Sequence, residues 1–125
     1  MKKLLLVALL SIQSAFVFAA SACDKPQNDF DGLYCLNKVY SQADKDLNEV
    51  YGKLAKALDG EGKALLKQGQ LEWISNRNNN CSTKNERGFF VNLDCATKTT
   101  IDRVKFLSDR LRECSSAGCM NSKLH

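Results

Sequence analysis

Six cysteines within 125 residues limit the fold of this chain more than any other feature of its sequence. An even number of cysteines in a short exported chain is typical of a fold braced by disulfides. The sequential pairing that we predict is Cys23–Cys35, Cys81–Cys95 and Cys114–Cys119. The alternative use of cysteines, a zinc site, needs paired CxxC spacing or cysteine with histidine. No CxxC occurs and the sole histidine is His125, so we predict no metal site and no cofactor.

The first 22 residues have the layout of a secretory signal peptide. Two lysines follow the initiator methionine, residues 4–19 are mostly apolar, and the small residues Ala20 and Ala22 precede Cys23. A membrane anchor is the alternative, but this apolar run is short for a span and contains polar residues. We predict cleavage before Cys23, no membrane span elsewhere, and a periplasmic or secreted domain over residues 23–125.

A cysteine directly after the cleavage point also raises the possibility of a lipoprotein anchored through Cys23. Lipidated cysteines usually follow a leucine and two small residues, whereas here Ala20 stands at the leucine position. Lipidation would also leave five cysteines, and an odd number leaves one free thiol in an oxidising compartment. A soluble exported product is therefore the favoured interpretation.

Apolar residues recur at alternating steps of three and four, which indicates amphipathic helices. We expect one helix over about residues 32–59, a second from 61 or 63 to about 79, and a third over about 92–112. Gly69 lies inside the second, where glycine is unfavourable by up to about 1 kcal/mol relative to alanine. The predicted fold is all-α: a small antiparallel bundle of about three helices braced by disulfides.

Two segments outside these helices are expected to be irregular. Residues 81–92 are predicted to form a polar loop, from which Phe89, Phe90 and Val91 return to the core. The short tail that begins at about residue 113 is expected to be mobile from Ser115 onward, apart from its disulfide clasp. About 100 residues after cleavage are enough for one domain with a modest core.

The sequence lacks the residue patterns of common enzymes. It has no internal histidine to act as a general base and no nucleophile elbow, phosphate-binding loop, dinucleotide fingerprint or zinc-protease motif. Carboxylates two residues apart, such as Asp44 and Asp46, point apart on a helix. We therefore predict no catalytic residues and a protein that is not an enzyme. Nucleic-acid binding is not predicted either, because acidic residues interrupt the basic third helix.

Charge is unevenly distributed along the chain. Residues 23–61 carry eight acids and five bases, and residues 62–125 carry six acids and eleven bases. The first segment suits a cationic partner and the second an anionic one. Solvated helix faces would give the same distribution, so the pattern alone identifies no partner.

The most distinctive local motif is Gln70-x-x-Trp73-Ile74-x-x-Arg77, followed by Cys81. Four of these residues follow one another at steps of three or four and so share one face of the second helix: Gln70, Trp73, Arg77 and Cys81. Tryptophan supplies a large apolar contact, and glutamine and arginine can bind loop carbonyls or acids beside it. We predict that this face is core and scaffold, and the alternative is a binding surface.

With these residues in view, the chain resembles the lysozyme-inhibitor LprI family of exported bacterial proteins over about residues 23–110. The matching pieces are, in order, Cys23 and Cys35, Leu36-Asn37 with Tyr40, Asp46-Leu47-Asn48-x-x-Tyr51-x-x-Leu54, Leu65-Leu66, Gln70-x-x-Trp73-Ile74-x-x-Arg77 with Cys81, and Cys95 with Thr100-x-x-Arg103-x-x-x-Leu107. Two features depart from the family. Asn78 stands where an acidic residue commonly follows the motif arginine, and the Cys114–Cys119 clasp is an addition.

The resemblance implies an exported binding protein that inhibits a lysozyme-type muramidase by blocking its cleft, without a cofactor. The alternative is a non-catalytic structural or interaction protein of the cell envelope. For a basic lysozyme as partner, the acidic residues of the first helix are expected to speed association. Basic residues of the 81–95 loop are expected to contact the cleft. The possible partner-binding residues are Asp44, Asp46, Glu49, Lys84 and Arg87.

Overall fold

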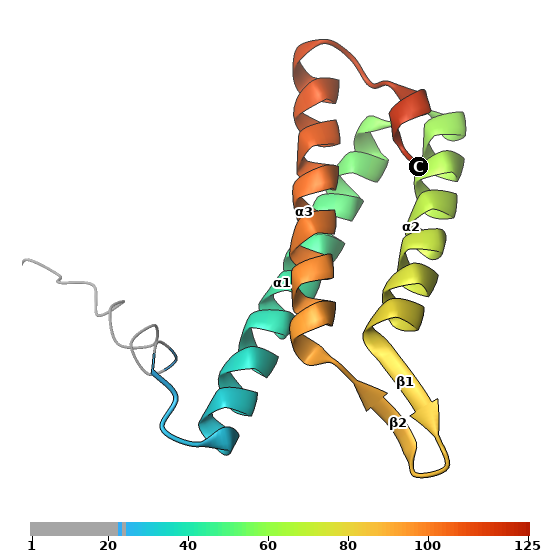
Figure 1. Ribbon diagram of the computed structural model, residues 1–125. Coiled ribbons are helices and arrows are strands. Elements are labelled where there is room, and N and C mark those ends of the chain that lie inside the picture. Colours follow the sequence, from blue (N-terminus) through green and yellow to red (C-terminus); the bar gives the residue numbers. More distant parts are fainter. Residues whose placement is uncertain (1–22, 24) are drawn as a thin grey trace, which may run out of the picture.

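The computed structural model describes Cys23 and residues 25–125, so the predicted signal peptide lies outside the described residues. Three helices and one short hairpin account for most of the described chain (Figure 1). In chain order the elements are α1 (Asp29–Ala57), α2 (Gly60–Cys81), β1 (Ser82–Asn85), β2 (Gly88–Val91), α3 (Leu93–Ser116) and the 3-10 helix η1 (Asn121–Lys123). No helix in this part of the chain is both long and apolar enough to cross a membrane.

Each long helix begins at a side chain that caps its free N–H groups. The Asn28 and Asn92 side chains accept from backbone N–H groups three residues further on, at 2.9 and 3.0 Å. Asp59 Oδ1 accepts from the Gly62 N–H at 2.7 Å. This bond lowers the pKa of Asp59 below its ordinary value, because it favours the ionised carboxylate. These N-terminal caps fix where α1, α2 and α3 begin.

The predicted all-α bundle is confirmed. Consecutive helices run in opposite directions, so that α2 is antiparallel to both α1 and α3 (Figure 1). The longest contact joins α1 to α3, which lie side by side. The core is aliphatic, with Leu54 of α1, Leu66 of α2 and Leu107 of α3 fully buried. Burial of such a side chain stabilises the fold by about 1.5–3 kcal/mol.

Residues 82–91 form an antiparallel hairpin, and the expectation of an irregular loop whose apolar residues return to the core was wrong. Phe89 is 73% exposed and Val91 64% exposed, and Phe90 is also exposed. These side chains are exposed because the hairpin projects from the end of the bundle, where no other described element covers it (Figure 1). Asn85 pairs with Gly88 across a two-residue turn, and Gly88 has a φ of +128°, which glycine tolerates best.

The tail also differs from the expectation of a mobile segment. α3 continues to Ser116, and the chain then folds back so that Leu124 is only 1% exposed and joins the core. Asn121 Nδ2 donates to the Asp59 cap at 3.3 Å, and Lys123 Nζ lies 3.4 Å from a Glu113 carboxylate oxygen. The sequence did not predict this packing, because one leucine in a mostly polar tail forms no apolar pattern.

Three disulfides brace the fold, in the sequential pairing that the sequence predicts. Cys23–Cys35 ties the N-terminal arm to α1, and Cys81–Cys95 joins the end of α2 to the start of α3. Cys114–Cys119 closes the turn that sends the tail back toward α2. In the chain-entropy model a short closed loop of this kind stabilises the native state by about 2–3 kcal/mol.

Replacement of two helical glycines tests the docking of the tail. A Cβ at Gly69 would lie 2.7 Å from the Leu124 carbonyl oxygen, whereas one at Gly52 meets nothing within 4 Å. We expect Gly52→Ala to raise the free energy of unfolding by about 0.5–1 kcal/mol through helix propensity. Gly69→Ala should lower it by about 1–3 kcal/mol, because the tail must shift. Denaturant titration measures both, and equal stabilisation by the two variants would contradict a docked tail.

Candidate functional site

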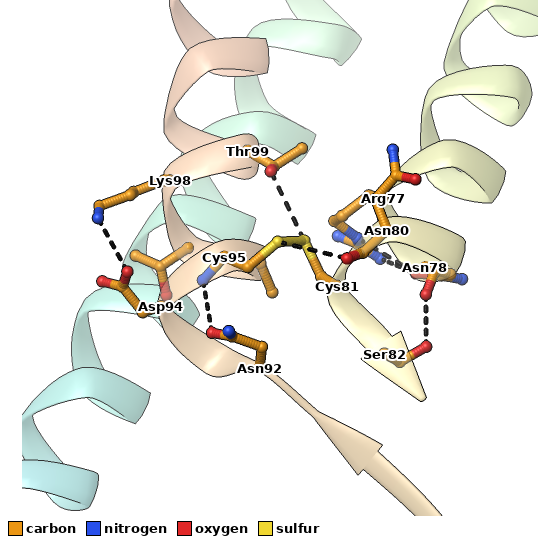
Figure 2. Close-up of a disulfide and its surroundings, with 12 residues drawn as sticks. Arg77, Asn78, Asn80, Cys81, Ser82, Asn92, Asp94, Cys95, Lys98 and Thr99 are labelled. Atoms are coloured by element: carbon orange, nitrogen blue, oxygen red, sulfur yellow. Dashed lines mark hydrogen bonds and ion pairs between the residues drawn. A yellow bond between two sulfur atoms is a disulfide. The ribbon is translucent and has the colours of Figure 1, made fainter. Parts of the chain in front are cut away.

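The hairpin rises from a base that a disulfide holds together (Figure 2). Cys81 is the last residue of α2, and its partner Cys95 lies in the first turn of α3. The Asn92 N–H donates to the Cys81 carbonyl at 2.7 Å, and the Ser82 hydroxyl donates to the Asn78 carbonyl. The first bond closes the base of the hairpin, and the second joins β1 to α2, so the hairpin leaves the bundle in a fixed direction.

Strand register divides the hairpin side chains between two faces. Ser82 pairs with Val91, and Lys84 pairs with Phe89. Residues directly opposite in a pair, and residues two apart in a strand, point to the same face. Ser82, Lys84, Phe89 and Val91 therefore share one face, and Lys84 Nζ lies 5.1 Å from the centre of the Phe89 ring. Phe90 lies on the opposite face with Thr83.

The first of these faces forms one wall of a groove of about 430 Å3. We call it the hairpin groove. It brings together side chains from all three helices and from the hairpin. Its principal lining residues are Tyr40 of α1, Arg77 and Asn78 of α2, Phe89 and Val91 of β2, and Ala96 of α3. The groove is thus mainly apolar, and it carries one formally charged lining residue, Arg77.

Arg77 lies between Trp73 and Asn78. Its guanidinium carbon is 4.9 Å from the centre of the Trp73 ring, a distance that suits a cation–π contact. Its Nε and Nη2 donate to Asn78 Oδ1 at 3.3 and 3.2 Å. Within the described part of the chain, no carboxylate forms an ion pair with Arg77. The positive charge of this arginine therefore faces only a neutral amide and an aromatic ring.

Further along the same motif, Gln70 contacts α3. Arg103 of α3 is only 8% exposed, and its Nε donates to Gln70 Oε1 at 3.0 Å. The Arg103 guanidinium also lies 4.8 Å from the Phe106 ring and 5.9 Å from the Trp73 ring. Its Nη2 is buried without a hydrogen-bond partner among the described residues. Burial lowers the pKa of Arg103 below its ordinary value.

The position of these motif residues favours a scaffold role. Trp73 is partly buried and packs against the aliphatic core. Thr100 is fully buried, and its hydroxyl donates to the Ala96 carbonyl at 2.7 Å. Gln70, Trp73 and Arg103 therefore meet at the interface of α2 and α3. Arg77 is the member of the predicted set that also reaches the hairpin groove.

The predicted acidic residues do not form one surface. Asp46 and Glu49 line a shallow groove between α1 and α3. Asp44 lies about 200° around the helix from Asp46, since each residue advances by about 100°. Glu49 accepts from Lys53 Nζ at 2.6 Å, and this hydrogen bond lowers the pKa of Glu49. Lys53 lines the same groove and offsets part of the negative charge of Glu49, but both side chains are exposed and the carboxylate stays accessible to solvent.

The two predicted basic residues both belong to the hairpin. Lys84 lies on β1, on the same hairpin face as Phe89 but outside the lining of the hairpin groove. Arg87 lies in the turn, where its N–H donates to Asn85 Oδ1 at 2.8 Å. Neither residue lines the groove that contains Asp46 and Glu49. In the described residues, no three His, Cys, Asp or Glu side chains gather closely enough to hold a metal ion.

Phe89 and Val91, which the sequence led us to expect in the core, are exposed and build the hairpin groove instead. A signal for the hairpin exists in the sequence, because a polar Asn-Glu-Arg-Gly turn separates Ser82–Asn85 from a run of aromatic and β-branched residues. Strands of four residues are too short for periodicity to show which face is buried.

We expect Gln70→Leu to lower the free energy of unfolding by about 1–3 kcal/mol, because it leaves the buried Arg103 guanidinium without its hydrogen bond. Adding Arg103→Met should restore most of the loss, since the buried charge is then removed with its partner. Gln68→Leu, on the exposed face of α2, is the control and should change stability by less than about 0.5 kcal/mol. Thermal and denaturant melts compare the three, and equal effects of Gln68→Leu and Gln70→Leu would contradict this account.

A protein-family model described as "Lysozyme inhibitor LprI" matches residues 21–107. The matched segment contains the Gln70–Arg77 motif, the whole hairpin, and every lining residue of the hairpin groove. It ends inside α3, before the Cys114–Cys119 clasp. Comparisons with curated proteins and with solved structures gave no match. Since the family model covers well over half of the chain, and the residues that led to the resemblance lie within it, this protein belongs to the LprI family of lysozyme inhibitors.

Proposed function

We propose that this protein inhibits a lysozyme-type muramidase by inserting the β1–β2 hairpin into the substrate cleft. The observation that carries the proposal is the hairpin itself, which projects from the bundle with exposed aromatic side chains and two cations, in a chain of an inhibitor family. Inhibition of this kind requires binding alone, with neither a cofactor nor turnover by the inhibitor.

The hairpin is suited to binding because its shape is set before the partner arrives. The Cys81–Cys95 disulfide and the Asn92–Cys81 hydrogen bond hold its base. A binding element that is already ordered loses less conformational entropy on association than a free loop. Phe89, Phe90 and Val91 then supply apolar surface that a cleft can cover, and burial of such surface is favourable by roughly 25 cal/mol per Å2.

The charges of the hairpin suit a glycosidase cleft. Most glycoside hydrolases place a pair of carboxylates on either side of the scissile bond. Lys84 and Arg87 are exposed, and neither forms an ion pair within the described part of the chain. Cations that enter such a cleft would lie near its carboxylates, where exclusion of water strengthens the attraction.

The proposed function also requires that the protein be exported to the compartment where muramidases act. Three disulfides fit an oxidising compartment, and the proposed signal peptide over residues 1–22 would deliver a soluble domain of residues 23–125 to the periplasm or beyond. Muramidases that attack the cell wall would be met there. The direct test is a muramidase assay with the purified mature protein against lysozymes of several structural classes. Inhibition of none of them would favour the alternative, a non-catalytic interaction protein of the cell envelope.

Charge reversal on the hairpin tests the contact. The double variant Lys84→Glu/Arg87→Glu should weaken binding at least about tenfold, mainly through faster dissociation, because it opposes the cleft carboxylates with like charge. Lys67→Glu/Lys105→Glu makes the same change in net charge at exposed positions of α2 and α3 and should have little effect. Surface plasmon resonance separates the two rates, and equal losses in both variants would mean that the hairpin does not enter the cleft.

Asp46 and Glu49, in the shallow groove between α1 and α3, are proposed to speed association with a basic lysozyme. Asp46→Asn/Glu49→Gln should slow association by about three- to tenfold at low salt and little at high salt, since ions screen such attraction. Glu72→Gln/Asp102→Asn removes the same charge from exposed positions elsewhere. Stopped-flow association measured over a range of ionic strength gives the comparison. A wild-type rate that does not depend on salt would contradict steering.

A further inference from the structure

We propose that the hairpin groove is a second contact site, which binds a carboxylate carried next to an apolar side chain on the target muramidase, with Arg77 as its principal ligand. This inference rests on the proposed function and goes beyond it, because the groove lies at the base of the hairpin rather than at its tip. The predicted occupant is thus an acidic residue with an apolar neighbour, on a loop at the edge of the cleft that the hairpin enters.

The apolar lining of the hairpin groove suits the apolar side chain that we expect next to the carboxylate. Tyr40, Phe89, Val91 and Ala96 line it, and Phe89 and Val91 remain largely exposed. The volume of about 430 Å3 lies within the range of roughly 300–1,000 Å3 that is usual for ligand sites. The groove is also open to solvent along one side, as a protein loop would require.

The electrostatics of the groove account for the carboxylate. Arg77 is the one charged residue of the lining, and no acidic side chain joins it there. Lys84 lies outside this lining but supplies a second cation nearby, 5.1 Å from the centre of the Phe89 ring. Asp94, near the disulfide, is paired with Lys98 at 2.8 Å (Figure 2). Two cations beside an apolar surface attract an anion and repel an amine.

Hydrogen bonding at Arg77 leaves room for such an anion. Two of its nitrogens donate to the neutral Oδ1 of Asn78, and no described residue accepts from Nη1. A guanidinium offers five donors in a planar fork that matches a carboxylate. Trp73 holds the guanidinium by its face, at 4.9 Å, so the arginine is positioned before the ligand arrives. Asn78 orients Arg77 without neutralising it.

Residue 78 therefore offers a test that leaves the groove in place. Asn78→Asp puts a carboxylate where the amide already contacts Arg77, so it should neutralise the guanidinium from within. We expect this variant to weaken binding to the muramidase at least about tenfold, because the new carboxylate competes with that of the target for Arg77. Asn79→Asp, at an exposed position outside the groove lining, adds the same charge and should change affinity less than about twofold. The melting temperature of each variant checks that both remain folded.

A small probe separates this inference from the proposed function. In the wild-type protein, 3-phenylpropionate should shift the NMR signals of the Arg77 side chain and of Phe89. The neutral 3-phenylpropanol should not do so, and Asn78→Asp should abolish the shifts. If a muramidase binds the wild-type protein, its affinities for Asn78→Asp and Asn79→Asp test the groove inference. Equal affinities would overturn that inference and leave the proposed function standing. Where none binds, the proposed function fails and the probe decides: shifts with the acid alone would support the site, and no shifts would overturn it.

Discussion

The Cys81–Cys95 bond is the constraint on which the exposed part of this structure depends. It fixes the end of α2 against the start of α3. Most lining residues of the hairpin groove lie close to one of its two cysteines in the sequence, and Tyr40 of α1 completes the lining. A hairpin with two four-residue strands is at best marginally stable alone. Since Phe89 and Val91 are exposed, the hairpin gains little from packing, and its order has to come from its base. In the chain-entropy model, closing a loop of this length contributes about 3 kcal/mol.

A second constraint acts where α2 meets α3, and it is polar. Arg103 lies in an otherwise apolar seam with one hydrogen bond, to Gln70, and with aromatic rings of Trp73 and Phe106 nearby. Burial of a charge is costly unless its partners are correctly placed. A shift of α2 along α3 would separate Gln70 from Arg103 and leave the charge without any partner. We interpret this pair as the feature that sets the register of α2, and therefore the place where the hairpin leaves the bundle.

The sequence was sufficient for the parts of the fold that follow from strong, repeated signals. Steps of three and four between apolar residues, such as Leu47, Val50 and Leu54, locate the helices, because a helical face repeats at that spacing. The sequence was insufficient where the packing of a segment depends on a single residue. Leu124 is the one leucine in a mostly polar tail, and nothing local marks it as buried. Gly69 reads as an unfavourable residue in a helix, and only the structure shows the tail backbone packed against it. The hairpin groove was missed for a related reason: Tyr40, Arg77 and Phe89 meet only through tertiary structure.

The two ends of α2 support different parts of the structure. Near its beginning, Gly62 and Gly69 leave space for the returning tail, which lies outside the segment matched by the family model. Near its end, Arg77 and Cys81 support the hairpin groove, which lies wholly inside that segment. Eight residues of helix separate Gly69 from Arg77, or about 12 Å. Effects at such a separation usually add independently unless the sites share a partner. The clasped tail can therefore stabilise the bundle without constraining the surface proposed to meet the muramidase, and Trp73, which lies between them, is where the two would be coupled.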